Sequence, residues 1–317
     1  MNADHATTDA PGGVDAVLMC GEGAASRPVL GDSKIYLPVN GQPIFLYVLD
    51  ALMLASRVRR IFIIGDKPRL EAAILTRDIR SKPVTVIAQG RNLLENVWRG
   101  FIATLDGYTE GMEKNNPDFA GRVILGLPGD SPLITPEEID DFIGEADMTK
   151  FDYVVGLTPA ASLARFQPSG GRPGIRMTSL HLREGLYRIS NLHLARPFAF
   201  KNRSAALEMY EMRYQRKLSN VLLFARHIWA TPGLRSRIWI YLALQACLTL
   251  SRMGLAGFAD ILRRLIPADK VLAVISHITG ARTGVAITTH GGAALDIDNE
   301  PDYLAMTEMF DQWRVAQ

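Results

Sequence analysis

The feature that most constrains this chain is a regular alternation of short apolar runs with longer helical segments through its first half. Apolar runs without a polar face are typical of strands that are buried on both faces of a parallel sheet. Strands are predicted at residues 14–20, 60–65, 84–88, 122–127 and 153–157. Helices are predicted at residues 44–55, 68–77 and 93–105, and from Pro136, where Thr135 is the N-cap.

These elements predict an α/β fold with three layers, in which helices cover both faces of a mostly parallel, twisted sheet. The later part of the chain is different in character, because glycine and proline cluster at residues 169–174 and basic residues outnumber acidic ones up to about residue 226. Further elements are expected as a strand–turn–strand at 180–197, helices within 205–265, short strands at 285–289 and 294–297, and a closing helix at 300–315.

The change in character also predicts how the chain is divided. Residues 1–13 are expected to be a disordered leader. Residues 14–160 together with 270–317 are expected to form the catalytic core, and residues 161–269 a basic and helical insertion.

Composition excludes several classes of protein. A net charge of +2 argues against a purely electrostatic nucleic-acid binder, so no nucleic acid is expected as a partner. Cys20 and Cys247 are the chain's two cysteines, which is too few for a disulfide framework and fits a reducing cytoplasm. The first 13 residues lack the pattern of a signal peptide, and the longest apolar run, residues 238–250, is shorter than the roughly 20 residues of a spanning helix.

Two polar segments directly follow predicted strands. Gly21, Glu22 and Gly23 come after the first strand, and Asp130 comes after the fourth. In sheets of this kind, ligands bind outside the carboxyl ends of the strands. Both segments are therefore expected at the ligand-binding edge.

Four segments together resemble the nucleotidyltransferases with a GT-A-like fold. Residues 17–27 are similar to the family's opening strand and glycine loop, with one extra residue before the arginine, and residues 33–44 to its lysine and Gly-x-Pro stretch. Residues 129–134 are similar to its aspartate turn, and residues 295–303 to its closing D-I-D motif. The family includes molybdopterin guanylyltransferase-like (MobA-like), methylerythritol-phosphate cytidylyltransferase-like and sugar-phosphate uridylyltransferase-like enzymes.

The resemblance implies the nucleotide-diphospho-sugar transferase-like form of this α/β fold, with a nucleotide site. A loop of small residues lets backbone N–H groups approach a triphosphate, and fixed cations stabilise its charge. Arg27 and Lys34 are the expected catalytic cations. The residues expected to bind the nucleotide are Gly21, Glu22, Gly23 and Ala24 at the phosphates and Gln89, Gly90 and Asn96 at the base and ribose.

A divalent metal, Mg²⁺ or Mn²⁺, is expected as the cofactor. Mg²⁺ takes few protein ligands, so one or two carboxylates suffice beside the phosphates. Asp130 is one expected ligand, and the second comes from Asp296 or Asp298, between which the sequence does not choose.

The basic middle of the chain is a candidate acceptor site. Arg176, Arg188 and Asn191 are the residues expected to bind a second phosphate, and a basic solvated face is the alternative. Residues 229–265 combine apolar residues with flanking arginines, so they can dock on a membrane surface or pack on the core or on a second subunit of a homodimer.

The sequence thus predicts a cytoplasmic, metal-dependent nucleotidyltransferase with a peripheral membrane contact as an option. It would transfer a nucleoside monophosphate from an NTP to a phosphorylated sugar, polyol or lipid precursor and release pyrophosphate. Two alternatives stay open, namely a GT-A glycosyltransferase that uses a nucleotide sugar, and a non-catalytic nucleotide-binding or membrane-surface protein.

Overall fold

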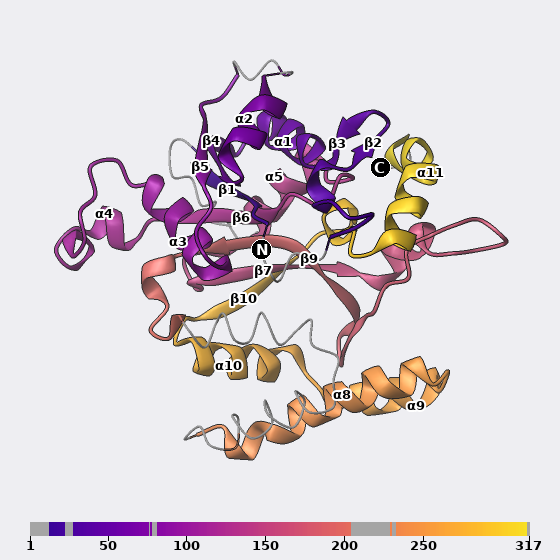
Figure 1. Cartoon of the computed structure of the whole chain (residues 1–317). Helices are drawn as coiled ribbons and strands as arrows, with labels where there is room; N and C mark the ends of the chain where they lie inside the picture. Colours follow the sequence, from indigo (N-terminus) through magenta and orange to yellow (C-terminus); the bar gives the residue numbers. More distant parts are fainter. Residues whose placement is uncertain are drawn as a thin grey trace, which may run out of the picture.

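An eight-stranded mixed sheet forms the centre of the molecule (Figure 1). The computed structural model describes residues 13–22, 28–75, 77, 81–203, 229 and 233–315. The strand order is β10-β7-β9-β6-β1-β4-β5, with β8 paired to β9. The strands are β1 (Val14–Cys20), β4 (Val58–Gly65), β5 (Val84–Ala88), β6 (Ile124–Pro128), β7 (Tyr153–Pro159), β8 (Leu180–Leu182), β9 (Gly185–Ala195) and β10 (Thr283–Ile287).

The sheet is mostly parallel, so the predicted α/β fold is confirmed. β1 pairs in parallel with β4 and β6, β4 with β5, and β7 with β10. Only β9 among the main strands runs the other way, between β6 and β7. The predicted strand–turn–strand corresponds to β8 and β9. The division of the chain into core and insertion stays a prediction. One strand of the predicted insertion (residues 161–269), β9, lies inside the sheet.

Helices cover both faces because neighbouring strand residues point to opposite sides. Ala16 and Leu18 of β1 pack into the apolar cluster that contains α1, α2 and α5, whereas Val17 packs with α3. The helices are α1 (Ile44–Leu54), α2 (Lys67–Ile74), α3 (Leu93–Ala103), α4 (Pro117–Ala120), α5 (Pro136–Glu145), α8 (Ile238–Arg252), α9 (Ala256–Arg263), α10 (Ala268–Thr279) and α11 (Glu300–Val315).

Thr135 caps α5 as predicted, since its hydroxyl accepts a hydrogen bond from the backbone N–H of Glu138 at 3.2 Å. The strand predicted at 294–297 is wrong. This segment follows a short 3-10 turn (Gly292–Ala294), and its apolar residues are buried beneath α11 instead of pairing in the sheet. Burial by a helix and burial in a sheet leave the same apolar signal in a short run.

An early segment of the chain packs on the closing helix beside the sheet. The hairpin β2 (Pro38–Val39) and β3 (Gln42–Pro43) lies next to α11 (Figure 1). The Tyr303 hydroxyl donates to the carbonyl of Pro38 at 2.7 Å, and the rings of Tyr47 and Phe310 are 4.7 Å apart. Within the described part of the chain, none of the helices combines the length and the apolar character needed to cross a membrane.

Asp15 is a buried charge in β1, with its carboxylate held by two arginines of β4. Arg59 Nε lies 2.7 Å from Asp15 Oδ1, and Arg60 Nη2 lies 2.8 Å from Oδ2. Burial alone would raise the pKa of Asp15, but the hydrogen bonds from Arg60 and Arg59 outweigh burial and hold the pKa below its usual value. The ionised pair therefore stabilises the fold above the unfolded-state pKa, and this stabilisation is lost as pH falls through the lower folded-state pKa.

We expect Asp15→Asn to lower the free energy of unfolding at pH 7 by about 2 kcal/mol, less than for a fully buried pair because both arginines are partly exposed. Urea denaturation measures the free energy of unfolding of both proteins, and the difference between the variant and the wild type should become smaller below about pH 4. Asp106→Asn is the matched control, because Asp106 also binds Arg60 but its side chain is 80% exposed. An equal loss of stability in the two variants would contradict the prediction.

Candidate functional site

The carboxyl ends of β1 and β6 lie side by side and place two polar segments together. Met19 is paired with Pro128, and the N–H of Gly129 donates to the carbonyl of Met19 at 3.0 Å. A Cβ on Gly129 would lie 2.7 Å from Cys20 Sγ and 3.2 Å from Phe45 Cβ, so only glycine fits this crossing. The chain then delivers Asp130 next to Gly21 and Glu22, at the edge predicted from the sequence.

Three carboxylates meet at this edge. One oxygen each of Asp130, Asp296 and Asp298 lie within 4.8 Å of one another. The two segments are joined through their backbones, since the N–H of Ile297 donates to the carbonyl of Asp130 at 3.1 Å. The structure therefore brings together the aspartate turn and both aspartates of the closing motif, which are more than 160 residues apart in the chain.

Lys34 lies among these carboxylates. Its Nζ is 2.5 Å from Asp130 Oδ2 and 3.3 Å from Asp298 Oδ1, and its side chain is 13% exposed. Burial alone would lower the pKa of Lys34, but the charges of Asp130 and Asp298 outweigh burial and raise the pKa. Lys34 is therefore a fixed cation at the predicted site.

Arg188 of β9 binds Asp296 from the other side. Arg188 Nη2 lies 2.7 Å from Asp296 Oδ1, and its Nε donates to the carbonyl of Ala294 at 2.7 Å. Burial would raise the pKa of Asp296, but Arg188 and Lys34 hold the pKa below its usual value. Asp298 differs, since burial and then the charge of Asp296 raise its pKa. The two late aspartates thus sit in different electrostatic environments.

The geometry fits a bound divalent cation. Asp130 Oδ1 is buried and has no hydrogen-bond partner among the described residues, although its second oxygen binds Lys34. An unpartnered carboxylate oxygen in the interior is costly unless a ligand satisfies it. Hard oxygen ligands are the donors that Mg²⁺ and Mn²⁺ prefer.

Two further side chains hold the loop before Asp296. Glu138 accepts from the N–H groups of Gly291 and Ala293 at 3.2 and 2.8 Å, and burial raises its pKa. Asn191 donates to the carbonyl of Ala293 at 3.1 Å and lies 3.5 Å from Ser131 Oγ. In the sequence, Glu138 is recognisable only as an acidic residue in the first turn of a helix. Its contact with a distant loop leaves no pattern in the sequence and was not predicted.

The predicted nucleotide residues also come together. The N–H of Glu22 donates to Gln89 Oε1 at 2.6 Å, and the N–H of Gly90 donates to Asn96 Oδ1 at 2.5 Å. A Cβ on Gly21 would lie 2.8 Å from Asn96 Nδ2, so the first glycine loop packs closely on the turn after β5. This turn follows a strand parallel to β1 through β4, so it opens at the same edge of the sheet.

Three of the predicted residues, Gly23, Ala24 and Arg27, lie outside the described residues. Arg176 is exposed in the loop before β8. A cation that the sequence analysis missed is Arg69 at the start of α2, whose guanidinium lies 3.8 Å from the ring centre of Tyr36.

Arg69 also binds two acids near the glycine loop. It reaches Asp32 at 2.6 Å and Glu22 at 3.4 Å. Its position directly after β4, at the edge where Gly21 and Asp130 lie, was the signal that could have found it.

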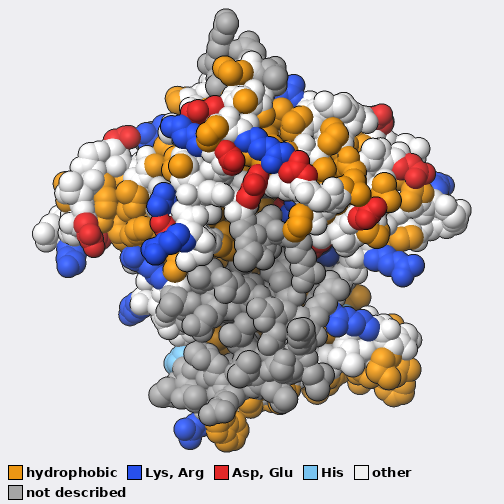
Figure 2. All heavy atoms as spheres, viewed as in Figure 1, with side chains coloured by type: hydrophobic (Ala, Val, Ile, Leu, Met, Phe, Trp, Pro, Cys, Tyr) orange, Lys and Arg blue, Asp and Glu red, His pale blue; other side chains and the backbone are white. Residues whose placement is uncertain are grey.

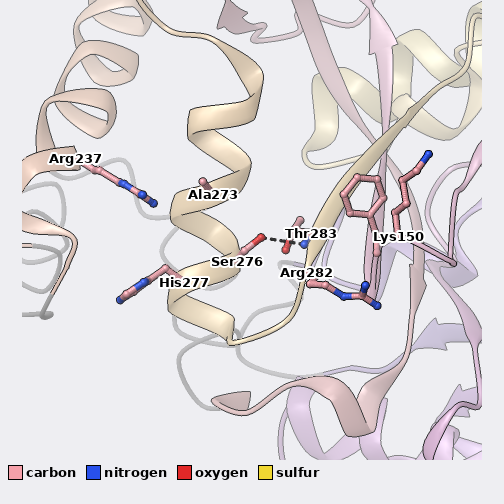
Figure 3. Close-up of a pocket in the computed structure, with 8 residues that line it drawn as sticks. Lys150, Arg237, Ala273, Ser276, His277, Arg282 and Thr283 are labelled. Atoms are coloured by element: carbon pink, nitrogen blue, oxygen red, sulfur yellow. Dashed lines mark hydrogen bonds between the residues drawn. The ribbon is translucent and has the colours of Figure 1, made fainter.

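A surface pocket lies elsewhere, between α10 and the start of β10. Lys150, Arg237, His277 and Arg282 supply its basic side chains, and Ser276 Oγ accepts from the N–H of Thr283 (Figure 3). It opens at the amino ends of β7 and β10, opposite to the carboxylate cluster. Lys150 and Arg282 are already paired with Asp147 and Asp152. The pocket is therefore separate from the candidate site.

Comparison with known proteins agrees with this geometry. No protein-family model matches the chain. The chain is 28% identical over 157 residues to a 2-C-methyl-D-erythritol 4-phosphate cytidylyltransferase of Parasynechococcus marenigrum (strain WH8102), a match that covers 46% of this chain and 66% of that protein. It is 33% identical over 87 residues to the enzyme of the same name from Synechococcus sp. (strain JA-3-3Ab), covering 26% and 37% of the two chains.

Among solved structures, a hypothetical transferase from Thermus thermophilus aligns with 92% of this chain and 99% of its own, with a TM-score of 0.60 and 22% identity. The resemblance to the GT-A-like nucleotidyltransferases is confirmed. The structural match shows that the two chains share a fold, and the two sequence matches are to enzymes named as cytidylyltransferases. The chain spans just under two thirds of one curated relative and about a third of the other.

Arg188 gives a test of the candidate site that does not depend on activity. We expect Arg188→Gln to lower the free energy of unfolding by about 3 kcal/mol at neutral pH, because it leaves the buried Asp296 carboxylate without its nearest cation. Chemical denaturation measures the change. Arg176→Gln, which alters an exposed arginine, should stay within about 0.5 kcal/mol of the wild type. If Arg188→Gln were as stable as this control, its role as the partner of Asp296 would be wrong.

Proposed function

We propose that the chain is a metal-dependent nucleotidyltransferase that transfers a nucleoside monophosphate from an NTP to a phosphorylated small molecule and releases pyrophosphate. The observation that carries the proposal is that Lys34 and the three carboxylates meet at the edge of the sheet where the Gly21–Glu22 segment leaves β1. A triphosphate needs backbone N–H groups, a fixed cation and a metal at one place. This edge has a backbone turn after β1, the cation Lys34 and carboxylates that would hold a metal.

Asp130 and Asp298 are the residues that we propose as metal ligands. Asp130 has a buried oxygen without a partner, whereas Asp296 is already bound by Arg188 and is better described as a supporting charge. A Mg²⁺ ion held there would neutralise negative charge on the α-phosphate. We therefore propose Asp298 in preference to Asp296 as the second ligand, a choice that the sequence leaves open.

The chain's own residues position the reacting groups. We propose that Lys34 turns from the carboxylates to the phosphates of the bound NTP, where Arg27 and the loop residues Gly21 to Ala24 also bind. Gln89, Gly90 and Asn96 would contact the base and ribose. An oxygen of the acceptor phosphate forms a bond to the α-phosphorus as the bond to pyrophosphate breaks. A phosphate nucleophile is already ionised at neutral pH, so the step needs no general base.

The relatives suggest where to look for substrates. Both are named as cytidylyltransferases that act on a sugar-alcohol phosphate, so CTP is the first nucleotide to test. We propose a sugar, polyol or lipid-precursor phosphate as acceptor and a cytoplasmic location, which agrees with the free, buried Cys20 and Cys247.

Pyrophosphate release tests the proposal. Each of the four NTPs should be incubated with a pool of sugar, polyol and lipid-precursor phosphates, with Mg²⁺ and with a chelator. We expect release with one NTP only when metal and acceptor are both present. The proposal fails if no NTP supports release and thermal shift detects no metal-dependent NTP binding.

Asp130→Asn should lower the rate of pyrophosphate release by about a hundredfold or more, because it removes a charged ligand at the reacting phosphate. Asp141→Asn is the control, since that carboxylate is 62% exposed at the surface. Melting temperatures of the two variants show whether the fold is intact. Comparable rates in these two variants would exclude Asp130 from the reaction.

Lys34→Met should bind Mn²⁺ more tightly than the wild type when no nucleotide is present, because the lysine no longer competes for Asp130 and Asp298. Electron paramagnetic resonance of free Mn²⁺ measures the affinity directly. Lys150→Met removes a lysine that is 74% exposed and should bind Mn²⁺ as the wild type does. Unchanged or weaker binding in Lys34→Met would show that Lys34 does not occupy the metal's place.

A further inference from the structure

The helices α8 and α9 form a hairpin that extends from the body of the molecule (Figure 1). Their inner faces pack on β8, where Ile240, Cys247 and Ala259 are buried against Leu182. Both helices contact β8 and each other, so the side chains on their opposite faces point away from the sheet. The inner face therefore holds the hairpin on the sheet. The outer face has no partner among the described residues.

The outer face is apolar. On α9 and just beyond it, Phe258, Ile261 and Leu265 follow helical spacing and are 64%, 64% and 62% exposed. On α8 and the turn after it, the exposed apolar residues are Trp239, Leu242 and Met253, at 39%, 46% and 67%. Figure 2 shows hydrophobic side chains gathered at the far end of the hairpin, with basic side chains near them. Apolar patches of this kind usually mark an interaction site, because water contact with them is unfavourable.

The charge around this face is mostly positive. From residue 233 to 259 the chain contains three arginines and no acidic residue, and one of the three, Arg237, lines the pocket beside α10 (Figure 3). The first acid is Asp260, which is paired with Arg263 at 2.6 Å and with Arg264 at 3.5 Å. The face is therefore apolar with a basic border, and it complements a surface that is apolar inside and negatively charged outside.

An anionic lipid bilayer has this complementary chemistry. Interfacial helices bury an apolar face at the boundary of headgroups and acyl chains, while arginines reach the phosphates. A second copy of the chain fits less well, because a symmetric contact through this face would bring arginines against arginines. Since no described helix can span a membrane, the contact would lie on its surface.

We propose that the outer face of the α8–α9 hairpin, formed by Trp239, Leu242, Met253, Phe258, Ile261 and Leu265 with its arginine border, docks the protein on an anionic membrane surface. This contact is independent of the nucleotide site, which lies at the carboxyl ends of the strands. Tests of the membrane contact and tests of the proposed reaction therefore have independent outcomes.

Co-sedimentation of the full chain with lipid vesicles tests the inference. We expect binding to vesicles of phosphatidylcholine mixed with phosphatidylglycerol and much weaker binding to phosphatidylcholine alone. Added salt should weaken the binding, since exposed charges are screened. A sample spun without vesicles shows whether the protein sediments by itself.

Two double variants separate the apolar and the charged contributions. Phe258→Ser with Ile261→Ser, and Arg252→Gln with Arg264→Gln, should each reduce vesicle binding by roughly tenfold or more. Leu304→Ser on α11 and Arg91→Gln are the controls, because these side chains are also exposed but lie elsewhere, and they should bind as the wild type does. Circular dichroism confirms that all four proteins remain folded.

Three results would overturn the inference. The first is no binding to anionic vesicles at low salt. The second is binding that the two double variants leave unchanged. The third is a dimer in light scattering that Phe258→Ser with Ile261→Ser dissociates while vesicles are not bound, which would assign the face to a second copy of this chain.

Discussion

The buried ion pair between Lys34 and Asp130 is the interaction on which the rest of the site depends. Three carboxylates lie within 4.8 Å, and charges this close in the interior repel strongly unless cations balance them. Lys34 and Arg188 supply two positive charges from distant parts of the chain. With all three acids ionised, one negative charge remains, and the unpartnered oxygen of Asp130 is the place where a further cation is needed.

Packing also explains how distant segments of the chain are joined at the site. Asp130 is fixed by β6 and by Gly129, which no larger residue can replace without a clash. The closing segment reaches it through the Ile297 backbone, and Glu138 holds the loop before that segment. α11 then covers the apolar side of the same segment. The site is therefore an outcome of packing between segments that do not follow one another in the sequence.

Much of the fold could be predicted because strands buried on both faces have an apolar pattern that surface segments do not share. Asp130 was proposed as a site residue because a carboxylate directly after such a strand lies at the ligand-binding edge. Asp296 and Asp298 were proposed because their segment resembles the closing motif of the family. The segment at 294–297 was mistaken for a strand because α11 buries it as completely as a sheet would. The contacts of Glu138 and Arg188 could not be predicted, because a partner more than 100 residues away leaves no periodic pattern in the sequence.

The ion pair also bears on how substrates would enter the proposed enzyme. A triphosphate alone would draw Lys34 away and leave Asp130 buried without a cation, and a metal alone would leave Lys34 buried without its anion. Breaking one side of a buried pair costs several kcal/mol, about 3–5 in measured cases. When the metal and the triphosphate bind together, the metal replaces Lys34 as the cation beside Asp130. The triphosphate replaces Asp130 as the anion beside Lys34. The geometry therefore favours the metal–NTP complex over either component alone, and the cost of separating Lys34 from Asp130 becomes a source of selectivity.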